Sequence, residues 1–179
     1  MALILKNIDL KILDFIYYHL HNPVLDKVMI FLSFIGNGSL IWIIIASLLL
    51  FKKRYRKVSF MLICSLILTS ILGELMLKPL IHRIRPFLNQ PLIKILVPLP
   101  HSFSFPSGHT AQSFAAVGIL AKAFKKHQLY IIVLAALIAF SRIYLFVHYP
   151  SDVLGGLLLG LACAEIIKKL CLTYLFPDS

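Results

Sequence analysis

Acidic residues are scarce in this sequence. Seven Asp and Glu stand against 18 Lys and Arg in 179 residues, and charged residues make up only 14%. Hydrophobic residues make up 60%, well above the roughly 45–50% of an ordinary soluble domain. A water-exposed fold of this composition would lack polar surface, so the composition excludes a soluble globular domain. The length suits a single membrane-embedded domain over residues 1–179.

Cysteine is also rare. Cys64, Cys163 and Cys171 lie in apolar segments, without the spacing of a metal site or a disulfide framework, and we expect them to be small buried hydrophobic residues. Residues 1–21 lack an uninterrupted apolar core, so we expect no cleavable signal peptide there.

The net charge of +11 is distributed in short basic clusters between apolar runs, at residues 52–57, 122–126 and 168–169. Such clusters are typical of membrane proteins that follow the positive-inside rule, and we therefore predict no nucleic-acid partner. If the apolar runs alternate across the bilayer, all these clusters fall on one side. We expect that side to be cytoplasmic.

The apolar runs predict an all-α fold, a polytopic membrane helix bundle. A helix needs about 20 residues to cross the hydrocarbon core, so we expect about five transmembrane helices. Residues 8–20 mix charges with apolar residues at helical spacing, which favours an N-terminal helix lying in the membrane interface. Gly36-Asn37-Gly38 predicts a bend or break in the first span. The five predicted spans are residues 26–51, 59–77, 108–124, 128–146 and 152–171.

This topology places the connection at residues 84–105 and the turn after Phe146 on the outer side together. The connection is long for so small a protein, which favours a functional role. Three polar stretches also fall on that side. They are Lys78 with Arg85-Pro86, then Pro106-Ser107-Gly108-His109, then Ser141-Arg142 with His148 and Asp152.

The residue types in these stretches suit phosphoryl chemistry. Lys78, Arg85 and Arg142 can neutralise the charge on phosphoryl oxygens. Ser107 and Gly108 stand at a predicted helix start, where unpaired N–H groups favour an anion.

Two histidines and one aspartate complete the set. A neutral His148 can attack phosphorus while Asp152 stabilises the charged ring, and His109 can protonate the leaving oxygen. Lys78 also has a simpler interpretation, an ion pair with Glu74 one turn earlier. For His82 and Arg83 we expect no role beyond interfacial anchoring.

These stretches resemble, residue for residue and in their spacing, the three signature motifs of the phosphatidic-acid phosphatase type 2 superfamily, across residues 78–152. The resemblance implies a reaction without metal or other cofactor through a phosphohistidine on His148. It assigns His109 as the acid and Asp152 as the partner of His148. The implied phosphate-binding residues are Lys78, Arg85, Ser107, Gly108 and Arg142.

The expected function is that of an enzyme, a lipid phosphatase acting at the outer face of the bacterial cytoplasmic (inner) membrane. Among small bacterial relatives the first candidate substrate is undecaprenyl diphosphate, followed by phosphatidylglycerol phosphate and phosphatidic acid. The motifs indicate recognition of a phosphate group. They do not identify the lipid that carries it, and they leave open whether the phosphate passes to water or to another lipid acceptor. The oligomeric state is also left open. A transporter is the alternative from another class, and it predicts that His148→Ala keeps function.

Overall fold

The computed structural model describes residues 2–90, 92–171 and 173, and every regular element in that part of the chain is helical. Pro91, in the predicted outer loop, lies outside the described residues, as do residues 1, 172 and 174–179. The predicted all-α class is confirmed.

The helices follow the apolar runs of the sequence. The first two, α1 and α2, meet at Asn22, whose side chain caps α2 by accepting the amides of Val24 and Leu25. Helices α2 and α3 are separated at Asn37–Ser39, where Gly38 and Ser39 have positive φ, which confirms the predicted break. The elements are α1 (Ala2–Leu20), α2 (Pro23–Gly36), α3 (Leu40–Leu50), α4 (Arg56–Ser70), the π-helix η3 (Ile71–Leu77), α5 (Lys78–Ile81), α6 (Gly108–Ala123), α7 (Gln128–Tyr144) and α8 (Pro150–Leu170), with short 3₁₀ turns between some of them.

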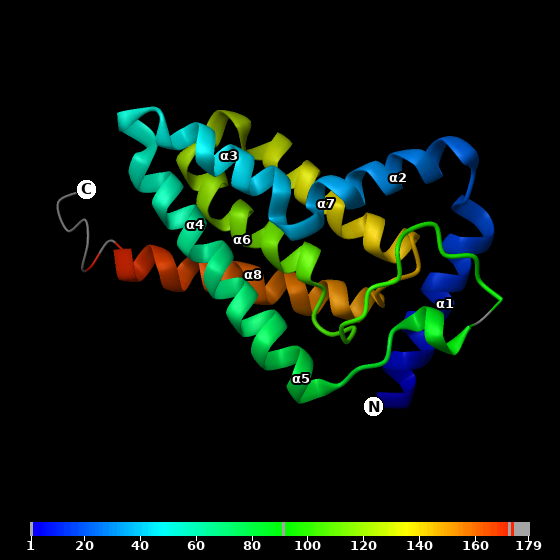
Figure 1. Cartoon of the computed structure of the whole chain (residues 1–179). Coiled ribbons are helices and arrows are strands. Elements are labelled where there is room, and N and C mark those ends of the chain that lie inside the picture. Colours follow the sequence, from blue (N-terminus) through cyan, green and yellow to red (C-terminus); the bar gives the residue numbers. More distant parts are fainter. Residues whose placement is uncertain (1, 91, 172, 174–179) are drawn as a thin grey trace.

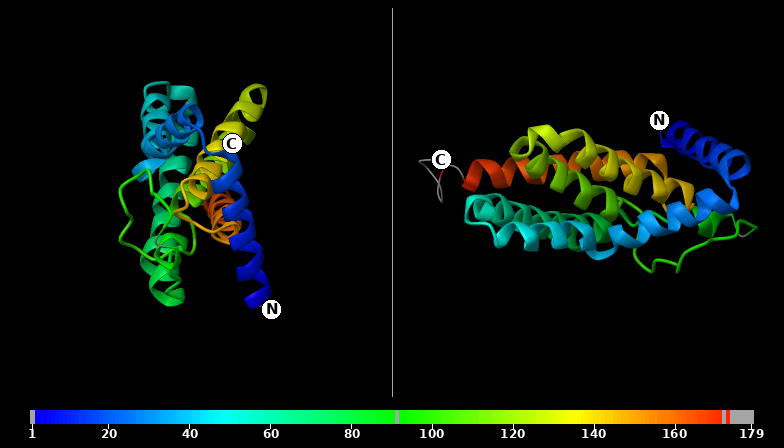
Figure 2. Two further views of the ribbon diagram at one scale, coloured as in Figure 1. Left: turned by 90° about the vertical axis from the view of Figure 1, so that its right-hand side faces the viewer. Right: turned by 90° about the horizontal axis from the view of Figure 1, so that it is seen from above.

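The helices form an elongated bundle with α6 in the middle, packed against α8, α7 and α4 (Figures 1 and 2). The α3–α4 turn, the α6–α7 turn and the end of α8 lie at one end of the bundle (Figure 1). These are the places of the three basic clusters, as the alternating topology predicts. Helix α1 and the long connection between α5 and α6 lie at the opposite end (Figure 1).

Within the described residues, three helical stretches are long and apolar enough to cross a membrane: Pro23–Leu50, Lys53–Asn89 and Lys125–Tyr144. Helices α6 and α8 coincide with the other two predicted spans, and the count of five stays a prediction. Large apolar side chains are exposed on the outer faces of the bundle, which suits contact with lipid. Among them are Phe31, Phe34, Ile43, Leu48, Ile67, Leu75, Leu129, Val133, Leu154 and Leu158.

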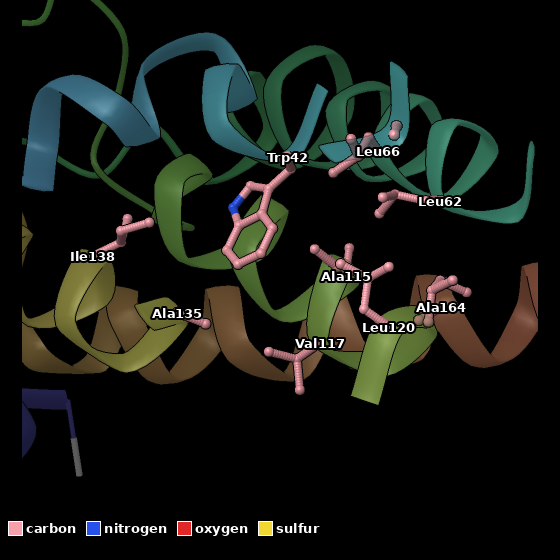
Figure 3. Packing of buried hydrophobic residues seen from close by; sticks show 12 residues of the cluster. Trp42, Leu62, Leu66, Ala115, Val117, Leu120, Ala135, Ile138 and Ala164 are labelled. Carbon is pink, nitrogen blue, oxygen red and sulfur yellow. The ribbon is translucent and has the colours of Figure 1, made fainter. Parts of the chain in front are cut away.

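The central helix α6 carries small residues, which let its neighbours approach closely. Its Ala115 is fully buried and belongs to a cluster with Trp42 of α3, Leu62 of α4 and Ile138 of α7 (Figure 3). The indole of Trp42 also donates to Ser113 Oγ at 3.0 Å, so its only polar atom is satisfied inside the core. This core fixes α6, which carries one of the three motifs at its start.

The contact between α6 and α8 depends on glycine. Gly156 and Gly160 stand four residues apart on α8. A Cβ at Gly156 would collide with the carbonyl oxygen of Ser107, the N-cap of α6, and a Cβ at Gly160 would collide with the backbone of α6 itself. At Gly160 that Cβ would meet the Ala111 carbonyl oxygen, and it would lie 2.7 Å from the Ala115 nitrogen. The two helices therefore pack backbone against backbone, which fixes His109 on α6 relative to Asp152 on α8.

Replacing Gly160 with alanine is therefore expected to destabilise the bundle. The obstructing atoms belong to backbone, so the added methyl group should cost about 1–3 kcal/mol of unfolding free energy. Thermal unfolding of the detergent-solubilised protein should show a midpoint several degrees lower. Gly73→Ala is the matched control, because its Cβ would meet only the Leu159 side chain at 3.4 Å. Equal midpoints for the two variants would contradict the close approach of α6 and α8.

Candidate active site

The three polar stretches meet around one cavity of about 780 Å³ at the α1 end of the bundle. Its wall includes a side chain or backbone from each stretch and also from the break between α2 and α3. The predicted site residues on this wall are Lys78, Arg85, Gly108, His109, Arg142 and His148.

Lys78 is buried at the junction between the π-helix η3 and α5. Its ammonium group lies 2.7 Å from a carboxylate oxygen of Glu74, so the simple ion pair proposed from the sequence is present. Lys78 also donates to Ser102 Oγ at 3.0 Å, and Glu74 itself lines the cavity. π-Helical segments are frequently found at functional sites, and this one carries Glu74 and ends directly before Lys78.

Arg85 is a buried residue of the connection between α5 and α6, and backbone carbonyl groups hold its guanidinium group in place. Its Nε donates to the Ser102 carbonyl at 2.7 Å, and its Nη1 donates to the Val147 carbonyl at 2.8 Å. The same Nη1 lies 3.0 Å from His148 Nε2. A guanidinium can only donate, so His148 Nε2 accepts this hydrogen bond and carries the lone pair.

Arg142, on the last turn of α7, is also buried and donates from Nη1 to Ser33 Oγ. Its Nε has no partner among the described residues. A buried donor of this kind on a cavity wall is suited to bind an oxygen of a ligand.

His109 is oriented by the break between α2 and α3. Its Nε2 lies 2.9 Å from Asn37 Oδ1 and 3.2 Å from the Ser33 carbonyl oxygen, and it donates to these acceptors. In a continuous helix the Asn37 amide would bind the Ser33 carbonyl, but here it binds the Phe34 carbonyl instead. The break therefore frees the acceptor that His109 uses.

His148 lies in the turn between α7 and α8, with only 2% of its surface exposed. Burial lowers the pKa of His148 to about 3, and the positive charges of Arg85 and Arg142 act in the same direction, while Asp152 opposes them. The ring is therefore neutral at neutral pH. His148 Nδ1 lies 3.5 Å from Asp152 Oδ2 and has no hydrogen-bond partner among the described residues.

Asp152 is fully buried in the first turn of α8. Its Oδ2 accepts from Ser104 Oγ at 2.5 Å and from the Tyr149 amide at 2.9 Å. Its Oδ1 accepts from Arg83 Nη1 at 2.5 Å. The carboxylate is thus fixed behind His148, away from the cavity.

Gly108 and Ser107 have different positions at the start of α6. Gly108 lines the cavity, and a Cβ there would lie 2.5 Å from Glu74 Oε1. Ser107 is fully buried behind the wall, where its hydroxyl accepts from Thr110 and its amide donates to the Asp152 carbonyl. The hydrogen bond from the Ser107 amide to Asp152 therefore connects the start of α6 to α8.

A second, apolar pocket of about 510 Å³ adjoins the charged cavity between α3 and α4. It is lined by side chains such as Ile43, Ile67 and Leu75. Four residues line both spaces, and they mark where the apolar pocket meets the charged cavity: Gly38, Ser39, Ser70 and Glu74.

Sequence reasoning missed several residues of this site. Arg83 was expected only to anchor the chain at the interface, but it contacts Asp152 directly. Ser102 and Ser104 come from the long connection, which had been predicted to be functional without naming a residue. Ser33 and Asn37 come from the helix break, which was visible as Gly36-Asn37-Gly38. Only this break and the position of Arg83 inside the Lys78–Arg85 stretch were signals in the sequence.

A helical membrane bundle with these three motifs around a cationic cavity defines the class, a membrane phosphatase. A family model of the PAP2 superfamily matches residues 54–174, and the chain belongs to this superfamily. The chain is therefore a hydrolase of phosphoric ester bonds, related to enzymes that act on lipid phosphates in membranes. The resemblance seen in the sequence is confirmed.

Three known proteins show the range of this similarity. The chain is 38% identical over 137 residues to an undecaprenyl-diphosphatase of Sulfolobus acidocaldarius, covering 76% of this chain and 66% of that protein. It is 34% identical to phosphatidylglycerophosphatase B of Bacillus subtilis, covering 83% and 76% of the two chains. The crystal structure of a transmembrane PAP2-type phosphatidylglycerolphosphate phosphatase from Bacillus subtilis superposes with a TM-score of 0.77 at 27% identity, covering 94% of this chain and 87% of that one.

Proposed function

We propose that this protein hydrolyses undecaprenyl diphosphate to undecaprenyl phosphate through a phosphohistidine on His148. The observation that carries the proposal is the joint geometry of the cavity. A neutral histidine with its lone pair on Nε2 stands among three buried cations, next to an apolar pocket.

The cations form the phosphate-binding part of the proposed site. Lys78, Arg85 and Arg142 approach the cavity from three different helices or loops, so they can contact different oxygens of one phosphoryl group. The free Nε of Arg142 supplies a donor for one of these oxygens. The Gly108 backbone at the start of α6 adds a helix N-terminus, and Ser107 contributes by fixing that turn.

The proposed chemistry has two steps. In the first, His148 Nε2 forms a bond to phosphorus while the bond from phosphorus to the leaving oxygen breaks, and His109, which enters this step as an imidazolium, gives that oxygen a proton. Asp152 stabilises the positive charge that develops on the His148 ring. In the second, water attacks phosphorus, its proton passes to His109, and the P–N bond breaks to release phosphate and neutral His148.

The apolar pocket accounts for a lipid substrate. A headgroup in the charged cavity would place its chain at Gly38, Ser39 and Ser70, where the two spaces meet. Among the relatives, the similarity to the undecaprenyl-diphosphatase supports a polyprenyl diphosphate. The similarity to phosphatidylglycerophosphatase B supports phosphatidylglycerol phosphate as the second candidate.

The substrate can be ranked directly with purified, detergent-solubilised protein. Phosphate release is measured from undecaprenyl diphosphate, phosphatidylglycerol phosphate and phosphatidic acid, with excess EDTA present. We expect EDTA-resistant release with the highest kcat/KM for the diphosphate. A higher kcat/KM for another lipid would replace the proposed substrate, and label appearing on a lipid acceptor would show phosphotransfer. Absence of release from all three lipids would refute the proposed function.

We further propose one domain over residues 1–179 in the cytoplasmic membrane, with the cavity facing outward. The three basic clusters, which all lie at the end of the bundle opposite the cavity, support this orientation. In a cysteine-free background, Leu92→Cys should react with a membrane-impermeant maleimide added to intact cells, because Leu92 is 97% exposed on the outer connection. Lys53→Cys, at the opposite end, should react only after permeabilisation. The reverse pattern would invert the topology.

A further inference from the structure

Helix α1 reaches the active site through a buried acidic residue. Asp9 is only 2% exposed, although it lies on a helix whose other face carries the exposed apolar residues Leu5, Ile8, Ile12 and Phe15. The inward face of α1 packs on α7 and α8, and Leu13 and Ile16 are buried there. A carboxylate in such a place is costly unless it is paired.

The partner of Asp9 is Arg83. Asp9 Oδ2 lies 2.7 Å from Arg83 Nη2, while Arg83 Nη1 lies 2.5 Å from Asp152 Oδ1. Ser151 completes the contact: its amide donates to Asp9 Oδ1 at 2.9 Å, its hydroxyl donates to Asp9 Oδ2, and it accepts from Arg83 Nη1 at 2.7 Å. One guanidinium therefore bridges two buried carboxylates.

Arg83 is itself held in place on both sides. Its side chain is 22% exposed, and its guanidinium carbon lies 4.2 Å from the centre of the Tyr149 ring. Its carbonyl accepts from the Ser104 amide at 2.8 Å, and the Ser104 hydroxyl binds Asp152. The orientation of Asp152 thus depends on one residue from α1 and two from the connection between α5 and α6.

The charges explain why two carboxylates are needed. Arg83 alone would neutralise Asp152 and weaken its attraction for the ring of His148. Asp9 compensates Arg83, so the group of three charges keeps a net negative charge behind His148. That charge favours the positive ring formed when His148 bonds to phosphorus.

From these contacts we infer that Asp9 and Arg83 are positioning residues for the phosphoryl-transfer step, acting through Asp152. The helix that carries Asp9 is then part of the active-site structure, and its exposed apolar face couples that structure to the membrane surface. The inference rests on the proposed phosphatase function. It concerns residues that do not touch the substrate cavity.

The test measures single turnovers with enzyme in excess over ³²P-labelled lipid. The rate constant at saturating enzyme does not depend on the fraction of inactive protein, so a merely structural role would leave it unchanged. We expect Asp9→Asn to lower this rate constant roughly 10- to 100-fold, because a misplacement of a catalytic group by about 1 Å can cost about 100-fold in rate. The matched control is Asp14→Asn on the same helix, since Asp14 binds Gln90 and not Arg83. It should stay within about twofold of the parent.

Two further variants keep the test decisive if Asp9→Asn does not fold. Arg83→Lys keeps the positive charge but loses the two guanidinium nitrogens that contact Asp9 and Asp152 separately. It should therefore lower the rate constant by a similar factor. Ser151→Ala removes one hydroxyl from the contact and should lower it roughly 2- to 10-fold. Parent-like rate constants in the variants that fold would overturn the inference while leaving the phosphatase function intact. An inactive parent protein would instead refute the proposed function.

Discussion

His148→Ala is expected to lower lipid phosphate hydrolysis by at least about 10⁴-fold, because loss of a nucleophile removes the covalent route entirely. After brief reaction with ³²P-labelled substrate, the parent protein should carry label that is stable to alkali and released by acid, as expected of a phosphohistidine. The variant should carry none. The measurement is phosphate release together with protein-bound label after rapid denaturation.

The control is His101→Ala, since His101 is exposed on the outer connection and does not line the cavity. It should retain parent-like turnover. Hydrolysis that survives in His148→Ala would contradict the nucleophile assignment, and it would also favour the transporter alternative for these charged residues. Label on the protein in that variant would point to another nucleophile.

His109→Gln is expected to have an effect that depends on the leaving group. Phosphatidylglycerol phosphate and phosphatidic acid release an alkoxide oxygen, which needs a proton, so kcat/KM should fall by roughly 10²–10⁴-fold. Undecaprenyl diphosphate releases a phosphate oxygen that is stable without protonation. Its loss should be about tenfold smaller at least, since the general acid contributes less to that step.

Parallel assays on the two classes of lipid check this expectation. His127→Gln is the matched control, because His127 is exposed at the opposite end of the bundle. Equal losses for esters and diphosphate would contradict the assignment of His109 as the acid. In that case its contacts with Ser33 and Asn37 would be the main reason for its place on the cavity wall.

The fold could be predicted largely from hydropathy. Helices occupy all five apolar runs because a backbone in hydrocarbon must satisfy its own hydrogen bonds. The position of α1 across the end of the bundle could not be predicted in the same way. Its apolar pattern suggested an interfacial helix, but periodicity does not show that Asp9 would face inward with Leu13.

The candidate site was predictable where its residues recur in fixed spacing. Lys78, Arg85, His109, Arg142 and His148 all line the cavity, as the three motifs together suggested. The supporting residues were not predictable, because they lie far in sequence from the residues they contact, on α1 and α2 or on irregular backbone. Asp9 and Arg83 are 74 positions apart, and Ser104 and Asp152 are 48 positions apart. The fixed spacing of residues within a motif does not predict contacts between residues so far apart in the sequence.

The break between α2 and α3 makes His109 a structural donor as well as a candidate catalyst. The Ser33 carbonyl loses its helical partner at this break, and a buried carbonyl left without a donor costs about 1–3 kcal/mol. A variant with an apolar side chain at position 109 would leave that oxygen without its donor. Loss of His109 would thus also weaken the contact between the start of α6 and the α2–α3 break.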